Sequence, residues 1–303
     1  MMKATRIRKT AIRHTAGDYA FLAFDWLILI LFFLILAYPL LYVIASSFSA
    51  MQITTLSLIP KKFSLEGYRA VIEYKYIWIG YANSLLYMTL GTAIALVVTI
   101  CCAYPLSRPD FKAGKLLMGL CLFTMYFSGG IIPTFLWIRD LGMLDTLWAI
   151  VLPTSLSVYN MIVMRTYFAN QIPGELHEAA MLDGCGDFRF LYGIVLPLSG
   201  PILAVIALYY AVAMWNAYFS AMIYISTRAK LPLPNFLREI LLLNMVNGME
   251  GNLNDLENLA KMEQRAELMK YSLIIVASLP VMLLYPFVQK YFVKGVMIGA
   301  VKG

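Results

Sequence analysis

Charged residues are scarce in this chain. Asp, Glu, Lys and Arg make up 14% of its 303 residues, hydrophobic residues make up 61%, and the mean hydropathy is +0.74. Soluble domains usually carry about 25% charged and about 45–50% apolar residues. The composition therefore excludes an ordinary soluble domain and predicts an integral membrane protein. The net charge of +7 fits Lys and Arg that anchor the cytoplasmic ends of spans, so it does not indicate a nucleic-acid partner.

The residues that enzymes use for metal and nucleophilic chemistry are also few. The chain has two histidines, and His177 begins a stretch like a zinc-protease motif that carries Met181 where the second histidine belongs. A zinc site needs at least three protein ligands, so the sequence predicts no metal site. The four cysteines show neither a CxxC nor a disulfide-framework spacing. Ser199 and Ser220 have no nearby base, so nucleophilic catalysis has no support.

A phosphate-binding loop is missing as well. Gly114-Lys115 is similar to the end of a Walker A loop, but Pro109 replaces its first glycine and Leu116 replaces its Ser or Thr. The chain is therefore predicted not to be an enzyme and to hydrolyse no ATP itself. Its apolar runs contain no central Asp, Glu, Lys or Arg, the charges that proton-coupled transporters use. A transporter built this way must take its energy from another subunit.

Long uncharged runs are what the sequence has instead. A transmembrane helix needs about 20 apolar residues, and runs of about that length predict six spans with both termini on one side. The segment 1–17 is basic without an acid, and the short 108–115 loop is basic too, so we expect both to be cytoplasmic. Pro133 predicts a kink in the third span. The predicted spans are 26–44, 83–105, 116–138, 146–164 (which contains Pro153), 202–225 and 271–289.

A polar stretch, 173–197, separates the fourth and fifth predicted spans. Pro173 suits the first turn of a helix, because its missing N–H has no partner there. Glu175 and Glu178 favour the positive end of that helix. A small apolar stripe is expected along one face, formed by Leu176, Ala179 and Ala180.

The second half of this stretch predicts another helix. Gly184 is expected to end the first helix, and Asp187 to cap a second short helix that starts at Phe188. This second helix is expected to end before Leu196-Pro197. Small residues on a contact face allow close approach, so helix, glycine and helix together indicate a docking surface. On physics alone, an amphipathic loop lying on the membrane surface remains the alternative.

The spacing within this stretch resembles the EAA motif of ABC-importer permeases. Glu178-Ala179-Ala180 is followed after three residues by Gly184, and after nine more by Ile194-x-Leu196-Pro197. Trp215-Asn216 and the C-terminal run from Tyr285 to Gly303 are similar to the oligosaccharide branch of carbohydrate-uptake permeases. The likeness covers essentially the whole chain. It is closest to the subgroup paired with large substrate-binding lipoproteins, which includes complex-polysaccharide and alginate-oligosaccharide uptake systems.

This resemblance implies a fold and an assembly. The fold is an all-α polytopic membrane protein with six transmembrane helices, the type I ABC importer (MetI-like) permease fold. It forms a single transmembrane domain over 1–303, with core spans two to six at about 80–292, a cytoplasmic coupling loop at 170–197 and a cytoplasmic tail at 293–303. The implied location is the bacterial cell membrane, and no cofactor is implied. The implied partners are a homologous second permease in a heterodimer, a cytoplasmic ABC ATPase dimer, an extracytoplasmic solute-binding lipoprotein, a carbohydrate substrate and the lipid bilayer.

The resemblance also implies roles for residues. Glu178 would pair with a basic residue of the ATPase, Gly184 would set the turn between two coupling helices, and Lys302-Gly303 would reach the ATPase interface. Asp187 departs from the family, which often has Ser or Thr there. The implied coupling residues are Glu178, Ala179, Ala180, Asp183, Gly184, Ile194, Leu196 and Pro197.

The cargo and its path are less specified by the sequence. ATP binding by the partner would drive alternating access, with the outer segments 50–78 and 226–270 facing the binding protein. Candidate substrate-pathway residues are Asn83, Asn160, Trp215, Asn216 and Tyr218, with packing between spans or an interfacial aromatic belt as the alternative. The other functions left open are a permease of the same superfamily for a non-sugar solute, and a non-transporting scaffold or sensor.

Overall fold

The computed structural model describes residues 15–49, 62–246, 269–286 and 289. Within these ranges the elements are helical, with one isolated antiparallel bridge between Ser49 and Phe63. The basic segment before Thr15, the stretch 247–268 and the tail with Lys302-Gly303 lie outside the described residues. The elements are α1 (Ala16–Ser47), α2 (Glu66–Glu73), α3 (Lys75–Ser107), α4 (Gly114–Tyr126), α5 (Ile131–Asp140), α6 (Trp148–Val151), α7 (Val158–Gln171), α8 (Gly174–Leu182), α9 (Asp187–Phe190), the π-helix η1 (Leu191–Val195), α10 (Leu196–Leu198), α11 (Gly200–Trp215), α12 (Tyr218–Tyr224), the 3₁₀ turn η2 (Arg228–Lys230), α13 (Leu233–Val246) and a last helix, Met269–Pro286.

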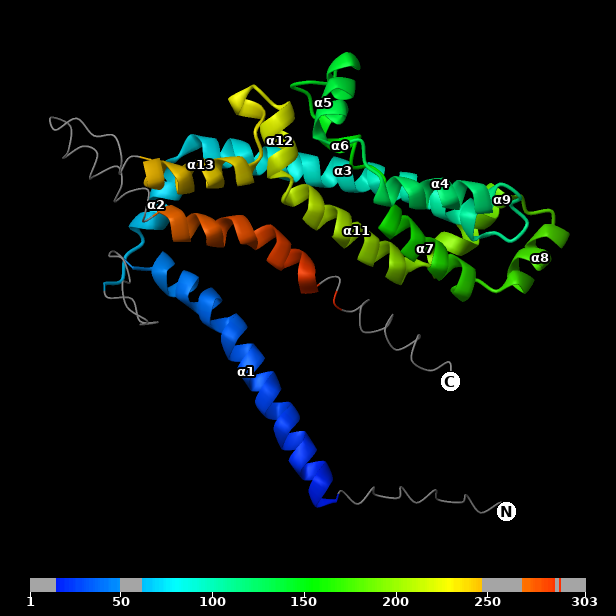
Figure 1. The fold of residues 1–303 in the computed structure, drawn as a ribbon, viewed down its shortest axis with the longest axis horizontal. Coiled ribbons are helices and arrows are strands. Elements are labelled where there is room, and N and C mark those ends of the chain that lie inside the picture. The colour runs from blue at the N-terminus through cyan, green and yellow to red at the C-terminus, as the bar shows by residue number, and fades with distance from the viewer. Residues whose placement is uncertain (1–14, 50–61, 247–268, 287–288, 290–303) are drawn as a thin grey trace.

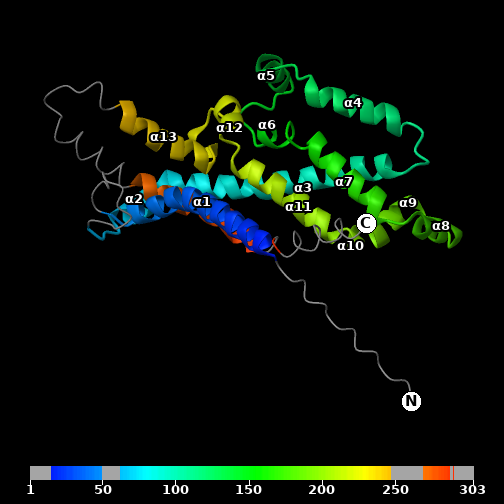
Figure 2. The same ribbon diagram turned by 60° about the horizontal axis from the view of Figure 1, so that its bottom comes forward.

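The long helix α3 forms the axis of the bundle, and α7, α11 and α13 pack along it (Figures 1 and 2). In the C-terminal half of α3, the Thr99 hydroxyl lies 2.7 Å from the Tyr210 hydroxyl of α11, which also accepts a hydrogen bond from the Ser157 backbone N–H at 3.0 Å. Near its start, a Cβ added to Gly80 would lie 2.6 Å from the Phe236 ring of α13. Glycine at this position therefore permits the close approach of α13 to α3.

Helix α1 stands away from the bundle along most of its length (Figure 1). It begins at Ala16, ten residues before the predicted span, because Thr15 and Asp18 form a capping box. None of its most apolar 18-residue window is buried. Its last turn joins the bundle, where the Ser47 hydroxyl lies 2.8 Å from the Tyr68 hydroxyl and the Ser47 carbonyl accepts a hydrogen bond from Ser272.

The third predicted span is two helices rather than one. Helices α4 and α5 meet at an angle of 113°. The bend lies between Tyr126 and Ile131, where Gly130 has a φ of +87°, so the predicted kink at Pro133 is wrong. Pro133 lies in the first turn of α5, a position where a missing N–H breaks no hydrogen bond.

Two further predicted spans are also interrupted. The fourth is divided into α6 and α7 around Pro153, and the fifth into α11 and α12 around Asn216. Within the described residues, three helices are long and apolar enough to cross a membrane, or up to five if each bent pair is one span. The architecture is therefore a helical membrane bundle, while the count of six spans stays a prediction.

Candidate functional site

The predicted coupling stretch forms a helix, a glycine turn and a second helical segment. Helix α8 follows Pro173, and Gly184 has a φ of +75°. The Gly184 N–H donates to Met181 O at 3.0 Å and the Cys185 N–H donates to Ala180 O at 2.9 Å. This pair of bonds is a Schellman motif, whose left-handed residue is usually glycine. The predicted stop at Gly184 is confirmed.

Two expectations for the second helix are wrong. Gly186 holds the cap position of α9, and the Asp187 carboxylate lies 3.3 Å from His177 Nε2 instead of capping the helix. The helical path also continues beyond Leu196-Pro197 to Leu198, and then turns by 84° into α11. The π-helix η1 directly precedes Pro197. In a regular α-helix a proline removes the hydrogen bond to the residue four positions before it, and the i→i+5 bonds of a π-helix differ from that pattern.

The coupling residues divide into an exposed set and an anchoring set. The three residues of the predicted apolar stripe lie on α8; Leu176 and Ala179 are exposed, while Ala180 is 8% exposed and packs against the rest of the chain. Ile194 and Leu196 are half-buried. The remaining predicted residues, all exposed, are Glu178, Asp183, Gly184 and Pro197.

Large apolar side chains are exposed beside this polar face. Leu182 and Phe188, on the two sides of the glycine turn, are each 89% exposed, and Tyr192 is 80% exposed. Exposed apolar groups with a polar rim are typical of a protein–protein contact. The stretch therefore presents a surface that combines a carboxylate with exposed apolar side chains.

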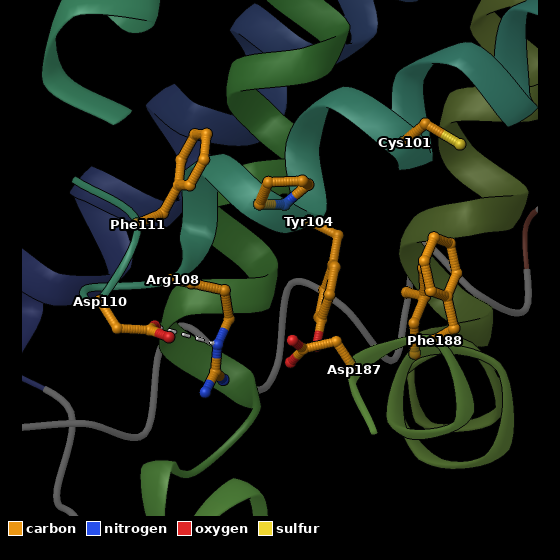
Figure 3. Close-up of a pocket in the computed structure, with 9 residues that line it drawn as sticks. Cys101, Tyr104, Arg108, Asp110, Phe111, Asp187 and Phe188 are labelled. Carbon is orange, nitrogen blue, oxygen red and sulfur yellow. Dashed lines mark ion pairs between the residues drawn. The ribbon is translucent and has the colours of Figure 1, made fainter. Parts of the chain in front are cut away.

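The base of this surface is buried around Phe190. Its fully buried ring contacts the His177 imidazole edge-on at 5.0 Å between centroids, and the Arg108 guanidinium lies 5.9 Å from the ring centroid. An adjoining pocket of about 390 Å³ is lined by Tyr104, Arg108 and Asp187, among others. Figure 3 shows Tyr104 and Arg108, from the end of α3, on the same side of this pocket as Asp187 of the coupling stretch. Sequence reasoning missed Arg108 and Phe190, because their contact joins distant segments.

A larger pocket of about 760 Å³ lies between the α6–α7 break and α11, and two of the predicted substrate-pathway residues line it. They are Asn160, which is 6% exposed, and Asn216, which is exposed. Tyr159 and Tyr209 line it too, at 57% and 40% exposed. No residue of this lining carries a charge. Sequence reasoning missed both tyrosines, although Tyr159 adjoins Asn160.

The other three predicted pathway residues make packing contacts. The Asn83 side chain donates to the carbonyls of Ala229 and Leu231, at 2.8 and 3.0 Å. The buried Trp215 indole donates to Ala277 O at 3.1 Å. Tyr218 is 40% exposed and lies under the Arg238 guanidinium, at 5.6 Å. These three do not line the 760 Å³ pocket.

Away from the coupling stretch, Asp145 in the turn before α6 binds the 226–230 loop. Its carboxylate accepts hydrogen bonds from Lys230 at 2.8 Å, from the Thr227 hydroxyl at 2.7 Å, and from the backbone N–H groups of Thr227 and Ser226. The hydrogen bond from Lys230, followed by those from Thr227, holds the pKa of Asp145 well below its ordinary value of 3.8. This network fixes the 226–230 loop to the turn before α6.

Asp145→Asn is expected to lower thermal stability at neutral pH and to remove part of its acid dependence. Because the folded-state pKa is lowered, the carboxylate stabilises the fold above pH 3.8 and loses that contribution as the pH falls below it. The gap in unfolding temperature between wild type and variant should therefore narrow on acidification. Asp140→Asn, which alters an exposed pair with Arg139, is the control. A gap that is absent at neutral pH, or constant with pH, contradicts this role.

Among the described residues, no group of three His, Cys, Asp or Glu side chains is placed to hold a metal ion.

No model of a known protein family matches the chain, but individual proteins do. The polygalacturonan/rhamnogalacturonan transport system permease protein YtcP of Bacillus subtilis (strain 168) is 41% identical over 286 residues, covering 92% of this chain and 98% of the relative. Protein LplC of the same organism is 39% identical over 268 residues, covering 88% and 89%. A chain in the crystal structure of a bacterial ABC transporter involved in the import of the acidic polysaccharide alginate is 31% identical, with a TM-score of 0.82, covering 93% of this chain and all of that one.

Proposed function

This chain belongs to the permease subunits of carbohydrate ABC transporters, and we propose that it takes part in the import of oligosaccharides released from acidic polysaccharides. Support comes from the names of its relatives, which refer to polygalacturonan, rhamnogalacturonan and alginate. A non-sugar solute is not favoured, because these relatives are named for sugars. The chain is a membrane transport subunit, and ATP hydrolysis falls to a partner.

We propose that the partners are a homologous permease, a cytoplasmic ATPase dimer and an extracytoplasmic binding lipoprotein. The observation that carries the ATPase assignment is the exposed face of the α8–Gly184–α9 unit. Glu178 supplies a carboxylate for a basic residue of the ATPase, while Leu182 and Phe188 supply apolar anchors. The buried Ala180 and the Schellman turn hold this face rigid, so that movement of the ATPase is passed on rather than absorbed.

The proposed topology has six spans, both termini in the cytoplasm, and the coupling stretch on the same side. A membrane-impermeant maleimide, applied to intact cells, tests it on single-cysteine variants. We expect labelling of Thr227→Cys in the outer loop and protection of Leu182→Cys. Labelling of both, or the reverse pattern, contradicts the topology.

We further propose that the 760 Å³ pocket is this subunit's part of the cargo path. Sugar rings stack on aromatic faces, and amides hydrogen-bond to hydroxyls. Tyr159 and Tyr209 supply the first kind of group, Asn160 and Asn216 the second. Because the lining of the pocket is uncharged, the pocket would bind the ring faces and hydroxyl groups of the sugars. The carboxylates of the sugars would then be bound by residues outside this pocket. Asn83, Trp215 and Tyr218 serve the path by holding its surrounding helices.

Tyr159→Ala is expected to lower the rate of oligosaccharide uptake several-fold, because each stacking contact contributes about 1 kcal/mol. Basal ATPase activity should not change, since the side chain lies away from the coupling stretch. Tyr126→Ala removes an equally large exposed ring from α4 and serves as the control. Equal uptake by Tyr159→Ala and wild type contradicts the proposed path.

The proposed function is tested by reconstituting the four components in proteoliposomes. Oligogalacturonates loaded onto the binding protein should stimulate ATPase activity and accumulate inside only when ATP reaches the ATPase. Neutral galacto-oligosaccharides are the comparison. Uptake that persists without this chain contradicts its role as permease, and stimulation by the neutral sugars alone contradicts the acidic cargo.

A further inference from the structure

The buried Phe190 ring is the point where three separate parts of the chain meet. His177 reaches its edge from α8, Arg108 lies over its face from the C-terminal end of α3, and Phe190 itself belongs to α9. His177 also lies 3.3 Å from Asp187, which ties α8 to the start of α9. The two halves of the coupling stretch are thus fastened to each other and to α3 at one place.

The surrounding packing makes this junction continuous with the bundle. Phe190 and Ala180 belong to the same buried cluster as Tyr104 and Phe168, from α3 and α7. The Arg165 side chain of α7 donates to Leu106 O at 2.7 Å, which holds the end of α3 against α7. A displacement of the coupling stretch therefore meets α3 directly, and not only α7 and α11, the helices that precede and follow it in the chain.

Helix α3 reaches from this junction to the opposite end of the molecule. Its 33 residues span about 50 Å at 1.5 Å per residue. Near its start, Asn83 donates to Ala229 O and Leu231 O, and the Tyr87 hydroxyl donates to Lys230 O at 2.7 Å. The same 226–231 loop is held by Asp145. One continuous helix thus connects the coupling stretch with the 226–231 loop.

We propose that Arg108 and Phe190 form the joint through which movement of the coupling stretch enters α3 and is carried to the 226–231 loop. This inference rests on the proposed ATPase docking but adds a route within this chain. Arg108 is a positioning residue here, because it touches neither ATP nor cargo. Its charge lies over Phe190 at the helix end, where the backbone carbonyls of α3 also favour a cation.

The test compares Arg108→Gln, Arg108→Lys and a control, Lys112→Gln, in the fully reconstituted transporter. Lys112 is exposed in the same loop, so its substitution removes a charge from that loop without touching Phe190. Arg108→Gln should keep the ATPase bound and hydrolysing ATP while the amount of oligogalacturonate imported per ATP falls about tenfold. Arg108→Lys, which keeps a cation over the ring, should recover a large part of that ratio.

The outcomes separate this joint from the proposed function. An unchanged import-to-ATP ratio in Arg108→Gln overturns the joint, and so does loss of ATPase binding in that variant, because the residue then serves docking. Equal losses in Arg108→Gln, Arg108→Lys and Lys112→Gln overturn it as well, since they reflect the loss of a loop charge or of the fold. Failure of the wild-type chain to bind any ATPase contradicts the proposed function itself.

Discussion

Glu178→Lys in the assembled transporter is expected to reduce both uptake and cargo-stimulated ATPase activity by at least about tenfold. The exposed carboxylate of α8 is proposed to meet a basic residue of the ATPase, and a lysine there sets two like charges against each other. Like charges across an interface cost several kcal/mol, and about 1.4 kcal/mol is tenfold in affinity. The measurements are uptake and ATPase activity in proteoliposomes.

The matched control is Glu175→Lys, the same charge change on the same helix. Glu175 lies in the first turn of α8, where a lysine opposes the helix dipole and costs about 0.3–1 kcal/mol of helix stability. Its effect on transport should be small by comparison. Equal activities of Glu178→Lys and wild type, or equal losses in the two variants, contradict a specific role for Glu178.

Gly184→Val is expected to lower the rate of uptake about tenfold. Gly184 has a φ of +75°, a conformation that costs a residue with a side chain about 1–2 kcal/mol and costs a β-branched residue most. The strain is relieved by changing the angle between α8 and α9, which misplaces Leu182 relative to Phe188. Uptake and ATPase binding are the measurements.

Two companion variants show whether the left-handed conformation is the cause. Gly184→Asn should retain much more activity, since asparagine tolerates this conformation better. Gly186→Ala should be nearly neutral, because its φ is −72° and a Cβ there meets nothing within 4 Å. If Gly184→Val transports normally, the turn is not part of the coupling surface.

The elements predictable from sequence were those set by local signals. Pro173 and Gly184 mark the start and the end of α8, because a missing N–H and a left-handed φ act within one turn. The capping box of Thr15 and Asp18 was an equally local signal, but it lies outside the uncharged run and was missed. The bend before α5 lies at Gly130, which has a positive φ, whereas the bend predicted from the sequence was at Pro133.

The candidate site was predictable only in its exposed half. The spacing of Glu178 and Gly184 indicated a docking surface, but the contacts that fix it depend on partners far along the chain. Phe190 is apolar in a mostly polar stretch, and nothing local pairs it with Arg108. Likewise, Asp187 was expected to act within its own helix, while the fold brings it to His177. Three of the predicted spans are interrupted, near Gly130, Pro153 and Asn216, and the length of an uncharged run alone does not predict where such breaks fall.

Photo-crosslinking tests directly whether the α8–Gly184–α9 surface binds the ATPase. A photoreactive amino acid replaces Leu182, which is 89% exposed beside the glycine turn, and in a second variant replaces Met222 of α12. We expect a covalent adduct with the ATPase from position 182 and none from position 222. An assembled, transporting complex that gives no ATPase adduct from position 182 would contradict this expectation.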